Sequence, residues 1–283
     1  MLKTIDDLRE NRATQQDYNL ITSLKPRLLQ VINSKPRLRI EVDIGGDGSH
    51  REVGIHASEV GFCARRQAYQ LIGQPKEAPV EPPRETEQLT FGLGHFTHAM
   101  FQAYLGELAK ADGAQFIPED KVHPTRQAVA AKHDLTSSCD GTWWHPLYNI
   151  VVEIKTVSSD IYKDIKEPKP EHVDQAHVYM VAFDIPLCWF IYVNKENGAF
   201  TECTTPWLIA FNDAHWEKLE IRIAEIRMLA GHGLLPPPEE SWFMCGSCVY
   251  GRACNPPGLQ KILAKQRRGL QTASMVSQYG VKK

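Results

Sequence analysis

Hydrophobic and charged side chains alternate most clearly over residues 150–155. Successive side chains of a β-strand point to opposite faces of the sheet, so the three even-numbered residues, all aliphatic, share one face. Glu153 and Lys155 share the other face. The pattern therefore predicts a strand with one aliphatic face and one face that carries an acid and a base.

A predicted hairpin brings a second acid close to this pair. The segment 145–149 contains a proline and an asparagine, which favour turns. A hairpin folded about this segment sets Asp140 opposite Glu153, with the ammonium group of Lys155 nearby. Opposed carboxylates repel each other and are costly to bury, and a hard divalent cation removes both costs. The alternative is an exposed polar strand face with an incidental ion pair.

Periodicity predicts several further elements. Loose helical periodicity covers residues 1–37, and clearer helices are predicted at 57–72 (beyond Cys63), 88–111, 171–183 and 212–230. Alternation predicts two more hairpins, at 38–56 and 188–203. A segment rich in lysine and proline is expected to link the strand at 150–155 to the helix at 171–183.

Two of these helices carry polar side chains that could meet the charged strand face. The helix at 88–111 presents His95, His98 and Gln102, and His95 and His98 are neighbours on its surface. Its predicted apolar face consists of Leu93, Phe96, Met100, Tyr104 and Leu108. In the helix at 171–183, Gln175 and Tyr179 lie one turn apart on one face.

Composition places the chain among ordinary globular proteins. The 283 residues are 42% hydrophobic and 23% charged, which is enough to bury a core. The formal net charge of -2 excludes a uniformly basic surface, so any contact with nucleic acid depends on local patches. Because the sequence contains neither a membrane-spanning run nor a secretory signal, we expect a cytoplasmic protein without membrane contact.

The seven cysteines divide into two groups. The cytoplasm keeps thiols reduced, so metal ligation or burial explains them better than disulfides. Cys245, Cys248 and Cys254 are closely spaced, as metal ligands are, and a fourth ligand would have to come from elsewhere. Cys188 and Cys203 lie in apolar or β-like segments and Cys139 precedes Asp140, so we interpret these three as structural.

Four short motifs occur in a fixed order along the chain. They are Gly94-His-Phe-Thr-His98, Cys139-Asp140-Gly141, Glu153-Ile-Lys155 and Gln175-Ala-His-Val-Tyr179. This order resembles the RecB-like branch of the PD-(D/E)XK nuclease superfamily, over about residues 56–256. Cys139 stands where the superfamily has the proline of its name. The resemblance implies an α/β fold of the restriction-endonuclease type, with a mixed sheet flanked by helices.

The resemblance also implies a role for each motif. Asp140, Glu153, His98 and the carbonyl of Ile154 would hold one or two Mg²⁺ or Mn²⁺ ions, which activate water and stabilise the phosphate in its transition state. Lys155 would lie beside the attacking water. The scissile strand would be positioned by two residues of the following helix, Gln175 and Tyr179. His95 competes with His98 as the metal ligand, and the family pattern favours His98.

A second resemblance concerns the cysteines. The segment Ser58-Glu-Val-Gly-Phe-Cys63-Ala-Arg-Arg66 resembles the start of the CRISPR-associated RecB-like exonucleases and of the AddB-type nuclease domains. Those proteins hold a 4Fe-4S cluster with one cysteine before the nuclease motifs and three after them. By this resemblance Cys63 joins Cys245, Cys248 and Cys254 as the fourth ligand. Spacing alone leaves Zn²⁺ open, since it also binds four cysteines, whereas the family order favours the cluster.

Basic and aromatic residues supply candidate contacts with DNA. Arg65 and Arg66 are the first candidates for binding phosphate. Further candidates are Lys163, Lys166 and Lys169 for phosphate, and Trp143 or Trp144 for stacking on unpaired bases. Alternation places Trp144 on the face of Asp140 and Trp143 on the opposite face, so at most one of them is expected to reach the substrate.

These observations predict three segments: an extension at 1–55, a nuclease domain with an iron-sulfur site at 56–256, and a basic tail at 257–283. The expected function is an Mg²⁺- or Mn²⁺-dependent exonuclease acting on single-stranded DNA or frayed ends, with partner proteins from recombination, replication or CRISPR adaptation. One alternative is a non-catalytic DNA-binding or scaffold subunit that keeps the fold and the cysteine site. Another is a Cys₄ zinc interaction module, which would leave the carboxylates unexplained.

Overall fold

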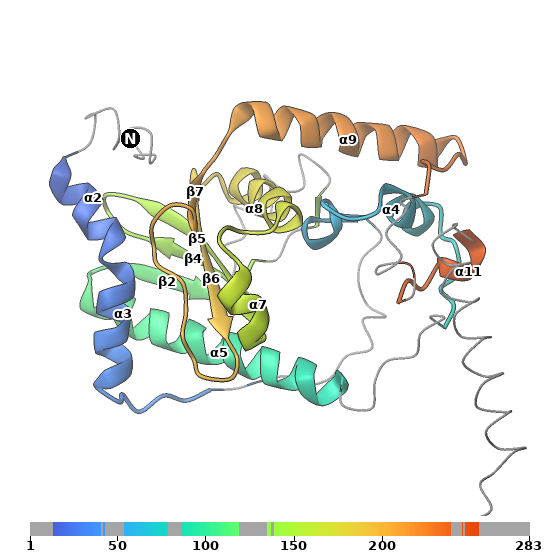
Figure 1. Cartoon of the computed structure of the whole chain (residues 1–283). Coiled ribbons are helices and arrows are strands. Elements are labelled where there is room, and N and C mark those ends of the chain that lie inside the picture. The colour runs from blue at the N-terminus through green and yellow to red at the C-terminus, as the bar shows by residue number, and fades with distance from the viewer. Residues whose placement is uncertain are drawn as a thin grey trace, which may run out of the picture. The chain divides into compact units, whose positions relative to one another are not determined.

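The computed structural model describes residues 14–40, 42, 54–78, 87–118, 135–136, 139–238, 245 and 247–254 (Figure 1). The chain forms two compact units. The first unit comprises Met1–Phe62 and Gln88–Arg222, and the second comprises Cys63–Glu87 and Ile223–Lys283. The predicted strands and the four nuclease-like motifs all belong to the first unit.

The first unit is built on a five-stranded mixed sheet in the order β2-β4-β5-β6-β7 (Figure 1). Its strands are β2 (Gln115–Pro118), β4 (Gly141–Trp144), β5 (Asn149–Val157), β6 (Leu187–Asn194) and β7 (Leu208–Ala210). β5 and β6 run parallel, whereas the other neighbours are antiparallel. The predicted mixed α/β architecture is confirmed, with β5 as the central strand.

The hairpin around β5 forms as the sequence predicts. Gly141 pairs with Val152, and the tight turn between the strands is closed by backbone hydrogen bonds between His145 and Tyr148. The register is fixed because only one alignment puts the aliphatic face of β5 toward the core. Asp140, one residue before β4, therefore lies beside Glu153.

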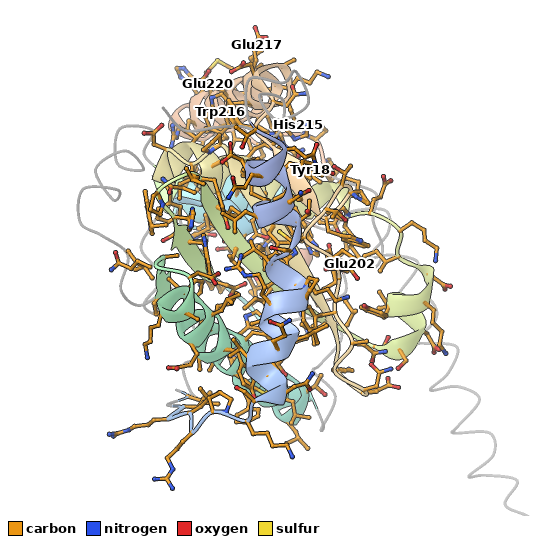
Figure 2. All side chains as sticks on the ribbon, turned by 90° about the vertical axis from the view of Figure 1, so that its left-hand side faces the viewer. Tyr18, Glu202, His215, Trp216, Glu217 and Glu220 are labelled. Atoms are coloured by element: carbon orange, nitrogen blue, oxygen red, sulfur yellow. The ribbon has the colours of Figure 1, made fainter. Side chains whose placement is uncertain are left out.

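The aliphatic face of β5 packs into the main core, where Ile150, Val152 and Ile154 are almost fully buried. Two helices in series, α2 (Gln15–Thr22) and α3 (Leu24–Asn33), contribute Ile21, Leu24 and Leu28 to this core. Figure 2 shows both helices in front of the sheet. α2 begins with a capping box between Thr14 and Asp17. Lys25 of α3 donates to the carbonyl of Phe200 and to Glu202.

The helix α5 (Glu87–Ala111) packs on the same core, but only the second half of its predicted apolar face takes part. Phe101, Leu105 and Leu108 are buried, whereas Leu93 is 57% exposed and Phe96 is 47% exposed. The prediction was wrong for the first half of the helix because periodicity assumes one partner along the whole length. Only the second half of α5 contacts the core cluster.

The charged face of β5 is covered by α8 (Pro170–Phe183), which also contacts a short 3-10 turn at Ala57–Glu59. Eight of the fourteen residues of α8 are buried, among them Gln175 and Tyr179. The helix starts at a proline, which suits the first helical position, and ends at Asp184 in the left-handed conformation (φ 52°). The linker before it contains a short helix, α7 (Ser159–Asp164), which was not predicted.

Two predicted hairpins are only partly present. After β6, a single bridge joins Val193 to Phe200, and the start of β6 pairs instead with β7. In the segment 38–56, residues 38–40 form no strand, and residues 43–53 lie outside the described residues. β1 (Ile55–His56) pairs in parallel with β3 (Leu135–Thr136), a distant partner that local alternation cannot predict.

In the second unit, the segment that follows Cys63 meets the segment that contains the cysteine cluster. α4 (Ala64–Leu71) begins directly after Cys63, as predicted. Tyr69 stacks on Tyr250 with ring centroids 5.4 Å apart. Other contacts join Arg65 to the carbonyl of Pro236 and the amide of Glu77 to the carbonyl of Val249. The short helix α11 (Gly251–Cys254) ends the described part.

One long helix, α9 (Asp213–Gly231), agrees with the predicted helix at 212–230. Among the described residues, no helix combines the length and the apolar character needed to cross a membrane. The predicted basic tail at 257–283 lies outside the described residues.

We predict that Gly61→Ala destabilises the first unit. A Cβ atom at Gly61 would lie 2.6 Å from the Cα atom and 2.8 Å from the carbonyl oxygen of Glu171, at the start of α8. These are backbone atoms and cannot rotate away, so we expect a loss of about 1–3 kcal/mol in urea unfolding. The control is Gly106→Ala in α5, where nothing lies within 4 Å and alanine should stabilise the helix by up to about 1 kcal/mol. Equal urea midpoints for the two variants would contradict the prediction.

Candidate active site

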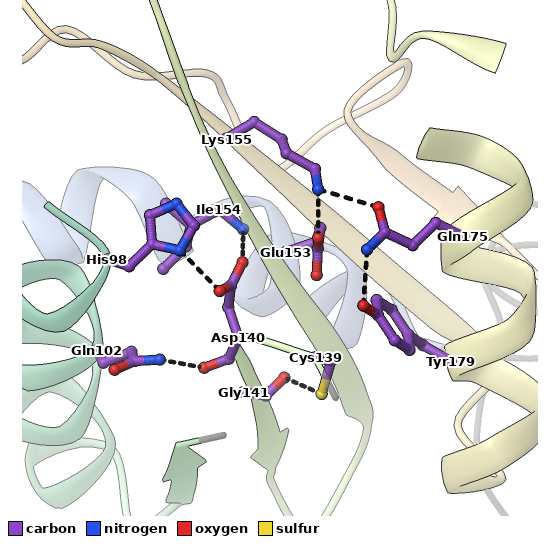
Figure 3. Close-up of polar contacts among 10 residues, drawn as sticks. All are labelled: His98, Gln102, Cys139, Asp140, Gly141, Glu153, Ile154, Lys155, Gln175 and Tyr179. Carbon is purple, nitrogen blue, oxygen red and sulfur yellow. Dashed lines mark hydrogen bonds and ion pairs between the residues drawn. The ribbon is translucent and has the colours of Figure 1, made fainter. Parts of the chain in front are cut away.

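A continuous chain of hydrogen bonds links the charged face of β5 to α8 (Figure 3). The ammonium nitrogen of Lys155 lies 2.6 Å from Oε1 of Glu153 and 3.0 Å from Oε1 of Gln175. The side-chain amide of Gln175 in turn donates to the hydroxyl of Tyr179 at 2.7 Å. Four residues that the sequence motifs single out are thus connected in one network.

Three of the four residues of this network are buried. Glu153 is 3% exposed, Gln175 is 6% exposed and Tyr179 is 2% exposed. The side chain of Lys155 is 21% exposed. The second carboxylate oxygen of Glu153, Oε2, is also buried and accepts no hydrogen bond from the residues that the structure describes. A buried carboxylate oxygen without a partner is costly, and such atoms in folded proteins call for a functional or ligand-based explanation.

Burial changes the pKa values of Glu153 and Lys155. Desolvation raises the pKa of Glu153, and the nearby charge of Asp140 adds to the rise, while Lys155 opposes it. Desolvation by itself would lower the pKa of Lys155, but the carboxylate of Glu153 outweighs it and the net pKa is raised. Two acids therefore share one ammonium group, and the ionised form of Glu153 would gain from an additional cation.

Asp140 is held from three directions (Figure 3). Its Oδ1 atom lies 2.8 Å from Nδ1 of His98, and its Oδ2 atom accepts a 2.6 Å hydrogen bond from the amide of Ile154. Its backbone carbonyl accepts a 2.8 Å hydrogen bond from Gln102. The helix α5 thus holds one side-chain oxygen and the main-chain carbonyl of Asp140, and the strand β5 holds the other side-chain oxygen.

Of the two histidines on α5, His98 contacts Asp140, and His95 is exposed. Burial alone would lower the pKa of His98, but the hydrogen bond to Asp140 and the charge of that carboxylate raise it. Sequence reasoning placed Gln102 on α5 without a role. Its position one turn after His98 is the signal that connects it with Asp140.

The types of side chain at this site fit a hard divalent cation, since two carboxylates and an imidazole meet beside a buried, unpartnered oxygen. Within the described part of the chain, however, no three His, Cys, Asp or Glu side chains are arranged so as to hold a metal ion. Both oxygens of Asp140 are engaged, one by His98 and one by the amide of Ile154. A metal ion would therefore bind Asp140 either through a remaining lone pair of these oxygens or in place of the contact with His98.

A cavity of about 1160 Å³ opens beside these residues. Asp140, Glu153, Gln175 and Tyr179 line it, together with residues from the first half of α5. This volume exceeds the roughly 300–1,000 Å³ of typical small-molecule pockets. The polar network is thus accessible from one side to a ligand of considerable size.

The cysteines occupy two environments. Cys139, Cys188 and Cys203 are fully buried in the first unit, as predicted for structural residues. The other four are half-buried cysteines of the second unit that form no disulfide: Cys63, Cys245, Cys248 and Cys254. Burial raises the pKa of Cys248, and the thiols of Cys63 and Cys254 are close enough to add to the rise. A four-cysteine metal site stays a prediction, because the described cysteines are not arranged as a metal-binding group.

The candidate DNA contacts lie in varied surroundings. Arg65 donates to the carbonyl of Pro236 and lies 3.8 Å from Sγ of Cys254, so its guanidinium is already engaged. Arg66 lies near Cys248, and its positive charge opposes the rise in the pKa of that thiol. Trp143 is only 1% exposed within the core, which removes it as a stacking platform. Trp144 is half-buried and donates to Thr142.

Comparisons with known proteins give remote similarities only. No family model and no curated protein matches the chain. The crystal structure of SSO0001 is 17% identical, with 84% of this chain and 96% of that chain covered and a TM-score of 0.42. LHK-Exo in complex with dAMP is 15% identical, with 64% and 89% covered and a TM-score of 0.41. A second structure of this alkaline exonuclease, from Laribacter hongkongensis, is 13% identical, with the same coverage and a TM-score of 0.37. These similarities are too low to assign the chain to a family.

We predict that Tyr179→Phe lowers the free energy of unfolding by about 1–2 kcal/mol, because it leaves the buried amide of Gln175 without its acceptor and opens no cavity. Thermal or urea unfolding measures the change. The matched control is Tyr18→Phe, at a position that is 38% exposed, where we expect a change within about 0.5 kcal/mol. A loss of the same size in both variants would argue against the hydrogen bond between Gln175 and Tyr179.

Proposed function

We propose that this protein is a metal-dependent DNA nuclease of the PD-(D/E)XK type, acting as an exonuclease on single strands or frayed ends. The observation that carries the proposal is the ion pair between the buried Glu153 and the half-buried Lys155. Glu153 lines a large cavity together with Asp140. The order of the sequence motifs supports the same function.

Stability alone does not explain this arrangement. Buried ion pairs are often no more stable than apolar residues of the same volume, because desolvation offsets their attraction. Here the pair also leaves Oε2 of Glu153 without a hydrogen bond from the described residues, next to a second acid. A site that tolerates these costs, and that opens to a cavity, is better explained by catalysis than by folding.

In this proposal Asp140 and Glu153 hold one or two Mg²⁺ or Mn²⁺ ions, with His98 and the carbonyl of Ile154. When bound, the metal lowers the pKa of a water molecule and stabilises negative charge on the phosphate. Lys155 presents its positive charge toward the attacking water and the phosphate oxygens.

The residues of α8 act through Lys155. Gln175 accepts a hydrogen bond from the ammonium group, and Tyr179 holds the amide of Gln175 in turn. This assigns both residues to the positioning of Lys155, in addition to the contact with the scissile strand that the sequence suggested. Gln175 and Tyr179 are buried and Lys155 is half-buried, which limits the rotamers available to the ammonium group.

We predict that Lys155→Met abolishes cleavage. The wild-type protein should degrade end-labelled single-stranded DNA with Mg²⁺ or Mn²⁺, and the variant should lose at least about 100-fold in kcat, since methionine keeps the volume without the charge. Lys110→Met, at a side chain 74% exposed on α5, should keep full activity. Activity that survives in Lys155→Met would refute the catalytic assignment. A wild-type protein that binds DNA but cleaves it with neither metal would support a non-catalytic DNA-binding or scaffold subunit.

We predict that Asp140→Asn and Glu153→Gln each weaken Mn²⁺ binding by at least about 10-fold in calorimetric titrations, because each removes one anionic oxygen ligand. His98→Ala should weaken it about 10- to 100-fold, whether His98 binds the metal directly or orients Asp140. His95→Ala should leave the affinity unchanged, because His95 is exposed and has no contact with Asp140. A larger effect of His95→Ala than of His98→Ala would reverse the choice between the two histidines.

We further propose that Cys63, Cys245, Cys248 and Cys254 hold a 4Fe-4S cluster in the second unit, with Zn²⁺ as the alternative. The donor set fits, because all four are cysteines of one unit that form no disulfide, and Cys63, Cys248 and Cys254 lie close enough to Tyr69 to help raise its pKa. The role would be structural: ligation would join the chain at residue 63 to the segment 245–254.

Protein purified without oxygen should be brown and should contain about four iron atoms per chain. Cys248→Ser should lose the visible absorbance and most of the iron. Cys203→Ala, which removes a buried thiol of the first unit, should keep the iron content of the folded protein. A colourless wild-type protein that contains zinc would rule out the cluster and favour the zinc site.

A further inference from the structure

The first half of α5 exposes an unusual number of large apolar side chains. Leu89 is 68% exposed, Phe91 is 60% exposed, Leu93 is 57% exposed and Phe96 is 47% exposed. All four lie within two turns of one helix, whereas the second half of the same helix is anchored in the core. By helical spacing, Leu89, Leu93 and Phe96 share one face of α5, and Phe91 lies on the opposite face. Single exposed apolar residues are common, so the position of Phe91 and not its exposure alone decides whether it has a role.

Phe91 has a defined position relative to the candidate metal site. It precedes His98 by two helical turns, so both side chains lie on one face of α5, about 10 Å apart along the helix axis. Gly94 lies between them on this face and carries no side chain. A Cβ atom there would lie 3.5 Å from Oγ1 of Thr156, so α5 crosses β5 closely at this point. Phe91, Gly94 and His98 all line the cavity described above.

Phe91 and Phe96 line the same cavity as Asp140 and Glu153. Lys195, on the turn after β6, lines this cavity too and is exposed. Its backbone amide donates to the carbonyl of Val157, which places the lysine at the end of β5. The neighbouring Glu196 carboxylate accepts a hydrogen bond from the amide of Ser159. One cavity thus combines an aromatic wall, an ammonium group and a pair of acids.

This combination suits a flexible polyanion that carries planar rings. We propose that Phe91 stacks on an unpaired base of a DNA strand whose scissile phosphate lies at Asp140 and Glu153, and that Lys195 binds another phosphate of that strand. The inference rests on the proposed nuclease function and names residues that would give it its preference for unpaired strands. In a duplex the faces of the bases are covered by their neighbours, so a stacking ring at this place favours single strands and frayed ends.

A second copy of the chain or a partner helix is a poorer occupant. Such partners need an apolar groove, and this cavity also carries Thr97, His95 and the charged groups already named. The acids would be left facing an apolar surface, which is costly. A strand held by metal ions at the two acids, by Lys195 and by the ring of Phe91 gives each of these groups a partner. Glu196 also lines the cavity, and its carboxylate keeps the hydrogen bond from the amide of Ser159.

The test measures binding of 5′-labelled single-stranded oligonucleotides in EDTA, where cleavage stops, and steady-state cleavage with Mn²⁺. Stacking on one base corresponds to about 5- to 100-fold in affinity, so Phe91→Ala should weaken binding and raise KM by that factor while kcat changes less. Phe91→Tyr should keep the affinity, and Phe91→Leu, apolar but without a ring, should behave like Phe91→Ala. Ile161→Ala removes another exposed apolar side chain, on α7, and should have no effect.

A series of oligonucleotides with one abasic site at each successive position locates the contact. At one position the abasic site should weaken binding to the wild-type protein about 10-fold and leave binding to Phe91→Ala unchanged. At the other positions both proteins should respond equally. Lys195→Ala should reduce the slope of log affinity against log salt concentration by about one for every oligonucleotide in the series. Lys110→Ala should leave this slope unchanged.

The outcomes separate this inference from the proposed function. Cleavage by the wild-type protein with equal abasic profiles for wild type and Phe91→Ala would overturn the stacking site and leave the nuclease proposal intact. A Phe91-dependent abasic profile without any cleavage would support the site and refute the catalytic proposal. A dimer in sedimentation that dissociates in Phe91→Ala, with DNA binding unchanged, would assign this surface to contacts between copies and overturn the inference.

Discussion

The ion pair between the buried Glu153 and the half-buried Lys155 is the interaction on which the arrangement of the site depends. The carboxylate can leave water only because it is hydrogen-bonded to Lys155, which is also hydrogen-bonded to Gln175. Gln175 can reach Lys155 only if α8 lies at a fixed distance from β5. The close approach of Gly61 to the first turn of α8 and the left-handed end at Asp184 define that helix and its position. The hydrogen bonds that the ion pair on β5 needs therefore constrain α8 and the segment around Gly61, which are distant from it in the sequence.

The two faces of β5 have different functions, and the helices that contact them differ accordingly. The aliphatic face provides the core that holds α3 and the second half of α5. The charged face meets α8 and the cavity. The helix α5 serves both, because its buried half anchors it while His98 and Gln102 reach Asp140. This anchoring allows the first half of the helix to carry exposed rings without loss of the fold.

The cysteines lie in two different environments, which correspond to two different roles. Three thiols are buried in the first unit and act as small apolar residues. The other four are half-buried in the second unit, where a segment after Cys63 contacts the segment around Val249 and Tyr250. Closely spaced cysteines signal this second use in the sequence, but spacing alone does not distinguish iron-sulfur from zinc, since both bind four thiolates.

The sequence by itself determined the features that depend on local geometry. Alternation defined the two faces of β5, turn residues placed Asp140 beside Glu153, and helical spacing aligned Gln175 with Tyr179. The tertiary structure alone decided the parallel pairing of β5 with β6, the pairing of Ile55 with Leu135, and the burial of Trp143. It also decided which part of α5 meets the core and leaves Phe91 exposed. These features join residues that are distant along the chain, and short-range periodicity carries no information about such partners.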